Sequence, residues 1–265
     1  MKVRIFAAMV LIPLLFIVFL FVPTVVTACV VGLMCVGAAY ELLHNTGFIA
    51  NKRVNVYAML SAFGVSMWCY LGSPAIYGLL GIMVLYALLF SEVMFTKLKV
   101  RSQEVLLCAF AALMMPYMLS ALLRIVMLEQ GRVYIFIPFL VAFLSDTGGY
   151  FAGMLFGKHK LCPTISPKKT VEGFVGGIFA SVAGMVVFKL LTGPLVSMGF
   201  AVFMGIIGAL GSVYGDLSMS AIKRQAGIKD YGRLIPGHGG ILDRFDSVLI
   251  TAPLTELLLV LFVLV

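Results

Sequence analysis

Long apolar runs constrain the fold of this chain more than any other feature of its sequence. Its residues are 62% hydrophobic and only 11% charged, which is far outside the range of soluble proteins. A transmembrane helix needs about 20 apolar residues. Runs of this length are expected at roughly 5–22, 24–43, 54–72, 75–95, 104–123, 133–157, 171–191, 195–222 and 241–265. The predicted fold class is all-α, a polytopic integral membrane protein with about nine transmembrane helices.

The first apolar run has two interpretations. Lys2 and Arg4 precede it, as basic residues do in a signal peptide, and residues 26–29 faintly resemble a lipoprotein cleavage site. The run is long, however, and a second run follows directly after it. We therefore expect an uncleaved first transmembrane helix.

The distribution of basic residues predicts the orientation in the membrane. If the N-terminus is cytoplasmic, all but three of the 19 lysines and arginines fall on the cytoplasmic side, the exceptions being Arg124, Arg132 and Lys189. This imbalance follows the positive-inside rule. We expect a multi-pass protein of the cell inner (plasma) membrane with its C-terminus outside. The net charge of +8 then reflects orientation and anion binding, and no nucleic-acid partner is expected.

Residues 1–132 differ from the rest of the chain in their acidic residues. They contain Glu41, Glu92, Glu104 and Glu129 near the ends of predicted helices, whereas all five aspartates come later. We expect residues 1–132 to form scaffold helices and residues 133–265 to form the bundle that carries the polar groups, with cytoplasmic loops at 158–170 and 223–242. Glycines spaced four apart indicate close helix packing in this bundle. They are Gly149, Gly153 and Gly157, Gly173 and Gly177, and Gly211 and Gly215.

Candidate metal ligands lie in the polar stretch 216–246. Asp216, Ser220 and Lys223 share one helical face. A carboxylate inside a membrane helix is costly, so it normally faces a cavity, a cation or a partner. Asp243 and Asp246 also share a face, at the start of the last predicted helix. Three carboxylates without a cysteine or histidine ligand set suit Mg²⁺, although salt bridges to nearby lysine or arginine side chains would be a purely structural alternative.

A glycine-rich loop separates these carboxylates. Gly237, Gly239 and Gly240 permit backbone conformations that expose N–H groups to an anion, and His238 between them is expected to contact a phosphate. A loop histidine without a ligand is the alternative for His238.

A second basic cluster follows the sixth predicted helix. Lysine, serine and threonine residues at 166–170 precede a helix start, where backbone N–H groups favour anions, so the segment is a candidate phosphate cradle. A loop that is basic only because of membrane orientation is the alternative. Asp146 is expected roughly 17 Å deep in the membrane, where it is either a metal ligand or a polar group buried between helices. Since both basic loops are expected on the cytoplasmic side, we predict one cavity there.

Two blocks of the sequence resemble a known family. The first is Ser220-x-x-Lys223-Arg224-x4-Lys229-Asp230-x-Gly232-x-x-Ile235-Pro236-x-His238-Gly239-Gly240-Ile241-x-Asp243-Arg244-Phe245-Asp246. The second comprises Gly157-Lys158, Ser166-Pro167-Lys168-Lys169-Thr170, Glu172-Gly173 and Gly176-Gly177. Both resemble the phosphatidate cytidylyltransferases (CDP-diacylglycerol synthases). The resemblance covers residues 145–246, and residues 1–132 match only in being hydrophobic.

The resemblance implies transfer of CMP from CTP to phosphatidic acid in phospholipid biosynthesis, with Mg²⁺ as cofactor, room for a second metal ion, and a homodimer in the membrane. It makes residues 133–265 the catalytic bundle. The metal ligands would be Asp216, Asp243, Asp246 and Asp146. The catalytic groups would be Lys223, Arg224, Lys229, His238 and Asp243. The substrate-binding groups would be Ser166, Lys168, Lys169, Thr170, Ser220, Gly239, Gly240 and Arg244.

Two other functions fit parts of the sequence. A CTP-dependent polyprenol or isoprenoid kinase would use the same nucleotide in the same membrane setting. A transporter of phosphorylated anions would also use basic groups and membrane carboxylates. The chain has no internal repeat and its charge lies mainly on one side, which disfavours the transporter.

Overall fold

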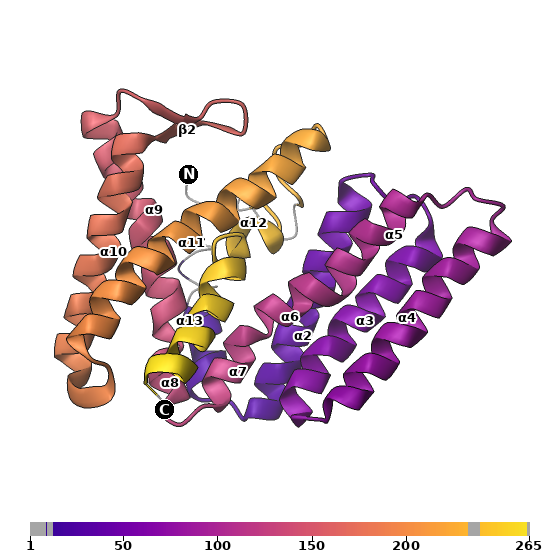
Figure 1. Ribbon diagram of the computed structural model, residues 1–265, viewed down its shortest axis with the longest axis horizontal. Helices are drawn as coiled ribbons and strands as arrows, with labels where there is room; N and C mark the ends of the chain where they lie inside the picture. Colours follow the sequence, from indigo (N-terminus) through magenta and orange to yellow (C-terminus); the bar gives the residue numbers. More distant parts are fainter. Residues whose placement is uncertain (1–8, 10–12, 233–238, 264–265) are drawn as a thin grey trace. The chain divides into compact units, whose positions relative to one another are not determined.

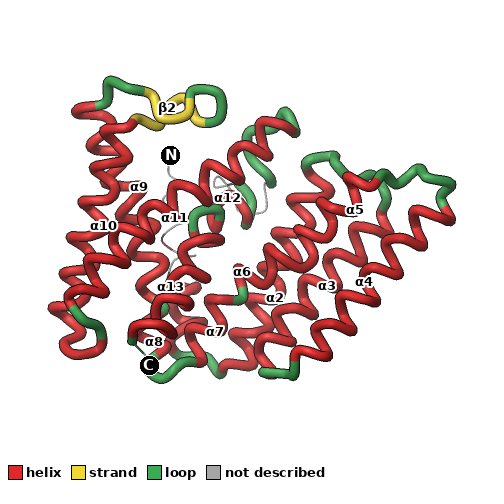
Figure 2. Tube along the Cα trace, viewed as in Figure 1, coloured by secondary structure: helices red, strands yellow, loops and turns green. Residues whose placement is uncertain are grey.

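The computed structural model describes residue 9, residues 13–232 and residues 239–263, and these are mostly helical (Figure 1; Figure 2). The elements before the β-hairpin are α2 (Thr24–Tyr40), η1 (Glu41–Asn45), α3 (Lys52–Leu71), α4 (Ala75–Phe95), α5 (Ser102–Ala109), η2 (Phe110–Met114), α6 (Met115–Leu119), α7 (Ala121–Met127), α8 (Gly131–Tyr134) and α9 (Phe136–Phe156). The hairpin and later elements are β1 (Lys160–Cys162), β2 (Ser166–Thr170), α10 (Val171–Thr192), η3 (Gly193–Leu195), α11 (Met198–Gln225), α12 (Leu242–Phe245) and α13 (Val248–Phe262).

Seven helices among the described residues are long and apolar enough to cross a membrane, which confirms the predicted fold class of a polytopic helical membrane protein. They are Thr24–Asn45, Lys52–Leu71, Ala75–Phe95, Ser102–Met127, Gly131–Phe156, Val171–Leu195 and Met198–Gln225. The first predicted run is described only in part, and its residues 13–20 are helical.

The last predicted helix is shorter than expected. Residues 241–265 contain the short helix α12, a turn, and then α13 with 15 residues. At 1.5 Å per residue, α13 is about 22 Å long, which is less than the roughly 30 Å of a bilayer core. The turn at residues 246–247 separates α12 from α13, and there the Asp246 side chain accepts a hydrogen bond from the N–H of Ser247 (2.8 Å).

One β-hairpin departs from the all-α expectation. Residues of the predicted loop 158–170 pair as antiparallel strands, with Lys160 opposite Thr170 and Cys162 opposite Ser166. Figure 2 shows the strands of this hairpin in yellow, beyond the ends of α9 and α10. It joins the end of α9 to the start of α10, where the Thr170 side chain caps α10 by accepting a hydrogen bond from the N–H of Gly173 (3.1 Å).

The chain divides into two compact units. The first contains Met1–Arg132 and Ala226–Arg244, and the second contains Val133–Gln225 and Phe245–Val265. The polar segment 226–244 therefore belongs to the same unit as the N-terminal helices. Within the first unit α2 and α3 pack together, and the Ser66 hydroxyl of α3 donates a hydrogen bond to the Ala28 carbonyl of α2 (3.3 Å).

Close helix packing at the spaced glycines is confirmed in the second unit. A Cβ atom on Gly173 would lie 2.6 Å from the Gly149 carbonyl oxygen, and one on Gly177 would lie 2.6 Å from the Ser145 carbonyl oxygen. These contacts join α10 to α9. A Cβ atom on Gly215 would lie 2.5 Å from the carbonyl oxygen of Asp246. Backbones in contact bring the polar side chains of α9, α10 and α11 near one another.

Candidate active site

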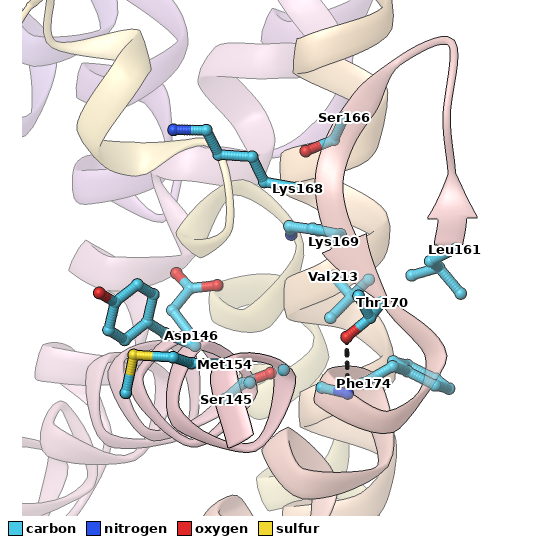
Figure 3. Close-up of a pocket in the computed structure, with 14 residues that line it drawn as sticks. Ser145, Asp146, Met154, Leu161, Ser166, Lys168, Lys169, Thr170, Phe174 and Val213 are labelled. Carbon is cyan, nitrogen blue, oxygen red and sulfur yellow. Dashed lines mark hydrogen bonds between the residues drawn. The ribbon is translucent and has the colours of Figure 1, made fainter. Parts of the chain in front are cut away.

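A cavity of about 380 Å³ lies in the second unit beneath the β-hairpin (Figure 3). Its size is within the usual range for small-molecule sites. The cavity is lined by residues of α9, the hairpin, α10 and α11, namely Ser145, Asp146, Gly149, Tyr150, Gly153, Met154, Leu161, Ser166, Lys168, Lys169, Thr170, Gly173, Phe174 and Val213. Polar and apolar groups therefore line the same space, as an amphiphilic substrate would require.

The hairpin and α9 bring opposite charges to this cavity. Asp146 reaches into it from α9, and Lys168 and Lys169 reach into it from β2 (Figure 3). Ser166 and Thr170, on the same strand, also line the cavity. The four residues predicted from the basic loop are therefore gathered at one site together with Asp146, as the proposed phosphate cradle requires.

Asp216 links α11 to the hairpin. Its carboxylate forms an ion pair with the Lys169 ammonium group, and both side chains are about three-quarters buried. The Ser220 hydroxyl, one helical turn further along α11, donates a hydrogen bond to Asp216 Oδ1 (3.1 Å). The predicted shared face of Asp216 and Ser220 is thus confirmed, and Lys169 is the ion-pair partner of Asp216.

Three carboxylates of the second unit form one electrostatic cluster. Asp146, Asp216 and Asp246 lie close enough for each to interact with the charge of the others. The positive charge of Lys169 interacts favourably with Asp146, and that of the buried Lys223 interacts favourably with Asp246. Mutual repulsion between carboxylates in a low-dielectric setting is unfavourable, so the cluster depends on neighbouring cations.

These carboxylates are the candidate metal ligands of the second unit. All their donor atoms are oxygens, which is the ligand chemistry that Mg²⁺ prefers. Among the residues that the structure describes, no three histidine, cysteine, aspartate or glutamate side chains are already gathered closely enough to hold a metal ion. The donor set fits Mg²⁺ in its chemistry, with lysine ammonium groups supplying the positive charge in this arrangement.

Further contacts hold the hairpin in place. The Glu172 carboxylate accepts hydrogen bonds from the N–H groups of Lys158 (3.1 Å) and His159 (3.2 Å), and it lies 2.6 Å from His159 Nδ1. Arg224 Nε donates to the Ile165 carbonyl oxygen (3.2 Å). Arg224, a predicted catalytic residue, is therefore bound to the hairpin turn and is exposed at the end of α11.

The other predicted residues that the structure describes belong to the first unit. Asp243 Oδ2 accepts hydrogen bonds from the N–H groups of Tyr231 (2.8 Å) and Gly240 (3.0 Å). The Gly240 N–H, expected to face an anion, thus binds a carboxylate of its own loop. Gly239 adopts a φ of +90°, a conformation that favours glycine. Lys229 and Arg244 are exposed, and His238 lies outside the described residues.

Glu41 was not among the predicted site residues. Its side chain is buried in the first unit, and its two carboxylate oxygens accept hydrogen bonds from the N–H groups of Ile241 and Leu242, both at 2.9 Å. The available signal was a glutamate at the end of a predicted apolar helix, where an acidic side chain needs partners. Its partners lie 200 residues later in the chain, so the sequence did not identify them.

Comparison with known proteins identifies the family. The cytidylyltransferase family profile matches residues 2–262, nearly the whole chain. The chain belongs to the cytidylyltransferase family.

Individual relatives match over a shorter length than the cytidylyltransferase profile. The phosphatidate cytidylyltransferases of Staphylococcus saprophyticus and Staphylococcus epidermidis are 47% and 45% identical to this chain over 132 residues. That of Staphylococcus aureus is 46% identical over 134 residues. Each match covers 50% of this chain and 51% of the relative, so the matched region spans about half the length of these curated relatives.

Proposed function

We propose that this cytidylyltransferase transfers CMP from CTP to phosphatidic acid, giving CDP-diacylglycerol and pyrophosphate in phospholipid biosynthesis. The observation that carries the proposal is the cavity of the second unit, where a lysine-bearing strand meets a cluster of carboxylates. The relatives named phosphatidate cytidylyltransferase point to the same reaction. The mixed lining suits a phosphate attached to a lipid, because Tyr150, Met154 and Phe174 accompany the charged groups.

In this reaction, an oxygen of the phosphatidic acid phosphate attacks the α-phosphorus of CTP. The new bond forms as the bond between the α-phosphorus and its bridging oxygen to the β-phosphorus breaks, and pyrophosphate leaves with the electron pair. The attacking phosphate is already ionised at neutral pH, so no strong general base is needed. Catalysis then depends on positioning and on neutralising the negative charge of the phosphates.

Residues of the cavity and of the neighbouring part of α11 would share this work. Lys169 and Lys223 would neutralise phosphate charge, and Ser220 would orient Asp216 through its hydrogen bond. Ser166, Lys168 and Thr170 would hold a phosphate beneath the hairpin. Further proposed phosphate-binding groups are Arg224 in the second unit and Lys229, Arg244 and the Gly239 backbone in the first unit. His238, outside the described residues, is also proposed as one.

We propose Mg²⁺ as the cofactor, as one ion or more than one, with Asp146, Asp216 and Asp246 of the second unit as its candidate ligands. Asp243 of the first unit is a separate candidate ligand. When bound, Mg²⁺ supplies charge neutralisation and polarisation of the phosphates. Lys169 would exchange its ion pair with Asp216 for a contact to the substrate, which frees the Asp216 carboxylate for this role.

The proposed setting is the cell inner membrane with the cavity facing the cytoplasm, because CTP is a cytoplasmic solute and the basic segments follow the positive-inside rule. The partners would be CTP, phosphatidic acid, membrane lipid and a second copy of the chain as a homodimer, with no nucleic acid. A reporter enzyme fused after Val265 should show its activity outside the cytoplasm and none inside it. Reporter activity inside the cytoplasm would contradict this orientation.

The decisive experiment uses CTP radiolabelled at either the α- or the γ-phosphorus, with the purified protein and phosphatidic acid in detergent. Cytidylyl transfer places the α label in a chloroform-soluble lipid and leaves the γ label in pyrophosphate. Transfer of the γ label to an added polyprenol would indicate the kinase instead. Flux of a phosphorylated anion into sealed vesicles, without any labelled lipid, would indicate a transporter.

A further inference from the structure

We infer that Glu41 is a positioning residue for this reaction: it holds the backbone of residues 239–243 and thereby sets the position of the Asp243 carboxylate. The inference rests on the proposed function, in which Asp243 belongs to the catalytic machinery. All the contacts that support it lie within the first unit.

The Glu41 carboxylate is fully engaged by the backbone of this segment. Its Oε1 atom accepts from the Ile241 N–H and its Oε2 atom from the Leu242 N–H, both at 2.9 Å. The residue is only 2% exposed. A buried carboxylate is strongly unfavourable without hydrogen-bond partners, so removing either side of this pair leaves an unsatisfied polar group. The two hydrogen bonds therefore fix Glu41 and the segment to each other.

The segment is also shaped around Glu41. A Cβ atom on Gly232 would lie 2.6 Å from Glu41 Oε1, and a Cβ atom on Gly240 would collide with the same carboxyl group. A side chain at Gly37, one turn earlier on α2, would collide with Ile241. Three glycines thus leave room for this one contact. Two of them, Gly232 and Gly240, belong to the block that resembles the family signature.

Asn45, in the same helical turn as Glu41, is connected to Asp243 through the backbone of Tyr231. Asn45 Nδ2 donates to the carbonyl oxygen of Tyr231 (2.9 Å), whose own N–H donates to Asp243 Oδ2 (2.8 Å). Gly240 supplies the other N–H on the same oxygen, and it stands next to the Ile241 that Glu41 holds. Both backbone donors of Asp243 are therefore positioned by residues of η1, the turn formed by Glu41–Asn45.

The conformation of η1 supports a positioning role. The turn is a π-helix at the end of α2, a rare conformation that is frequently found at functional sites. It directs both Glu41 and Asn45 to the returning segment. If Glu41 served only to cap α12, its loss would reduce stability but would leave the catalytic parameters of the folded protein unchanged. A positioning role predicts a change in turnover that exceeds any change in stability.

The test compares Glu41→Gln with the matched control Glu92→Gln in the full-length protein. Glu92 is also buried in the first unit, and its carboxylate binds Asn51 and Tyr57 and pairs with the exposed Arg53 (3.5 Å) rather than with the 239–243 segment. Glutamine has one acceptor oxygen where glutamate has two, so Glu41→Gln leaves one of the two backbone N–H groups without its partner. Misplacement of a catalytic group by about 1 Å can lower the rate roughly 10²-fold.

We expect Glu41→Gln to lower kcat for CDP-diacylglycerol formation roughly 10²-fold, with a melting temperature close to that of Glu92→Gln. Glu92→Gln should stay near wild-type activity. In hydrogen–deuterium exchange, the amides of residues 239–243 should exchange faster in Glu41→Gln, whereas those of α10 should not change. Wild-type kcat in Glu41→Gln, or equal losses of activity and stability in the two variants, would overturn the inference.

A second variant covers the case in which Glu41→Gln does not fold. Asn45→Ala removes one neutral hydrogen bond and leaves Glu41 in place, so it should fold, lower kcat several-fold, and speed exchange at Tyr231. Unchanged kcat and exchange in this variant would overturn the inference. The proposed function can fail separately: if the wild-type protein makes no CDP-diacylglycerol, the exchange measurement still reports whether Glu41 holds the segment.

Discussion

Asp216 in the second unit and the Glu41 and Asp243 carboxylates in the first unit have different kinds of partner. In the second unit, Asp216 pairs with the ammonium group of Lys169 and accepts a hydrogen bond from the hydroxyl group of Ser220, beside a cavity. In the first unit, Glu41 and Asp243 accept hydrogen bonds from backbone N–H groups. A lysine side chain can move to another anion, but a backbone N–H moves only with its segment. The comparison separates carboxylates suited to exchange partners with a substrate from carboxylates that set the shape of a loop.

The largest effect is expected at Asp243, which is proposed both to act in catalysis and to shape its loop through backbone hydrogen bonds. Asp243→Asn should abolish turnover, a loss of at least roughly 10³-fold, while folding and membrane insertion remain intact. The asparagine oxygen can still accept from Tyr231 and Gly240, so the loop keeps its shape and only the charge is lost. Steady-state rates and the melting temperature in detergent measure the two effects. A fully active variant would remove Asp243 from the catalytic machinery and leave it a purely structural residue.

The next effect tests the movable ion pair of the second unit. Lys169→Met should lower kcat/KM for CTP by about 10²-fold, because a group that neutralises phosphate charge is lost. Lys160→Met is the control, since Lys160 is exposed on the same hairpin and does not line the cavity. Equal rates in the two variants would mean that the Lys169–Asp216 pair is structural. Asp216 would then have a fixed partner, as Glu41 and Asp243 do.

A smaller effect is expected where the second unit depends on backbone contact. Gly177→Ala should destabilise the protein by about 1–3 kcal/mol, because the new methyl group meets the Ser145 carbonyl oxygen and forces α9 and α10 apart. Gly64→Ala, in α3 of the first unit, is the control because, apart from neighbouring residues of its own helix, no described atom lies within 4 Å of the position that its Cβ would take. It should be neutral or stabilising by up to about 1 kcal/mol. Thermal unfolding in detergent distinguishes the two, and equal stability would contradict the packing.

The smallest effect is expected at the start of α10. Thr170→Ala removes the hydroxyl that accepts from the Gly173 N–H, and it should lower stability by about 1 kcal/mol. Thr170→Ser keeps the oxygen and should retain most of the stability. Unfolding measured without substrate isolates this cap from any phosphate contact of Thr170. If serine and alanine destabilise equally, the hydroxyl is not what holds the hairpin to the helix.

Several features were predictable because they depend on residues near one another in the chain. Apolar length predicted about nine membrane-spanning helices, and seven of them are long apolar helices in the described part of the chain. Helical spacing placed Asp216 and Ser220 on one face, and spaced glycines predicted the contact of α9 with α10. The basic segment with Ser166 and Thr170, predicted as a loop that could hold a phosphate, lines the cavity.

Other features depend on contacts between distant segments and could not be read from local patterns. The hairpin replaced an expected loop, because its strands satisfy each other's backbone groups. Residues 226–244 joined the first unit, where Glu41 holds Ile241 from 200 residues away. A glutamate at the end of an apolar helix indicates that a partner is needed, but it carries no information about which backbone N–H groups will supply it.

The sequence alone determined that this chain is a helical membrane protein with the polar motifs of a cytidylyltransferase, because hydrophobic length and motif spacing are properties of the chain itself. Only the tertiary structure decided which carboxylate meets a lysine and which meets a backbone amide. Those pairings arise when helices pack, since each buried charge must then find its partner among whatever groups the fold brings within reach.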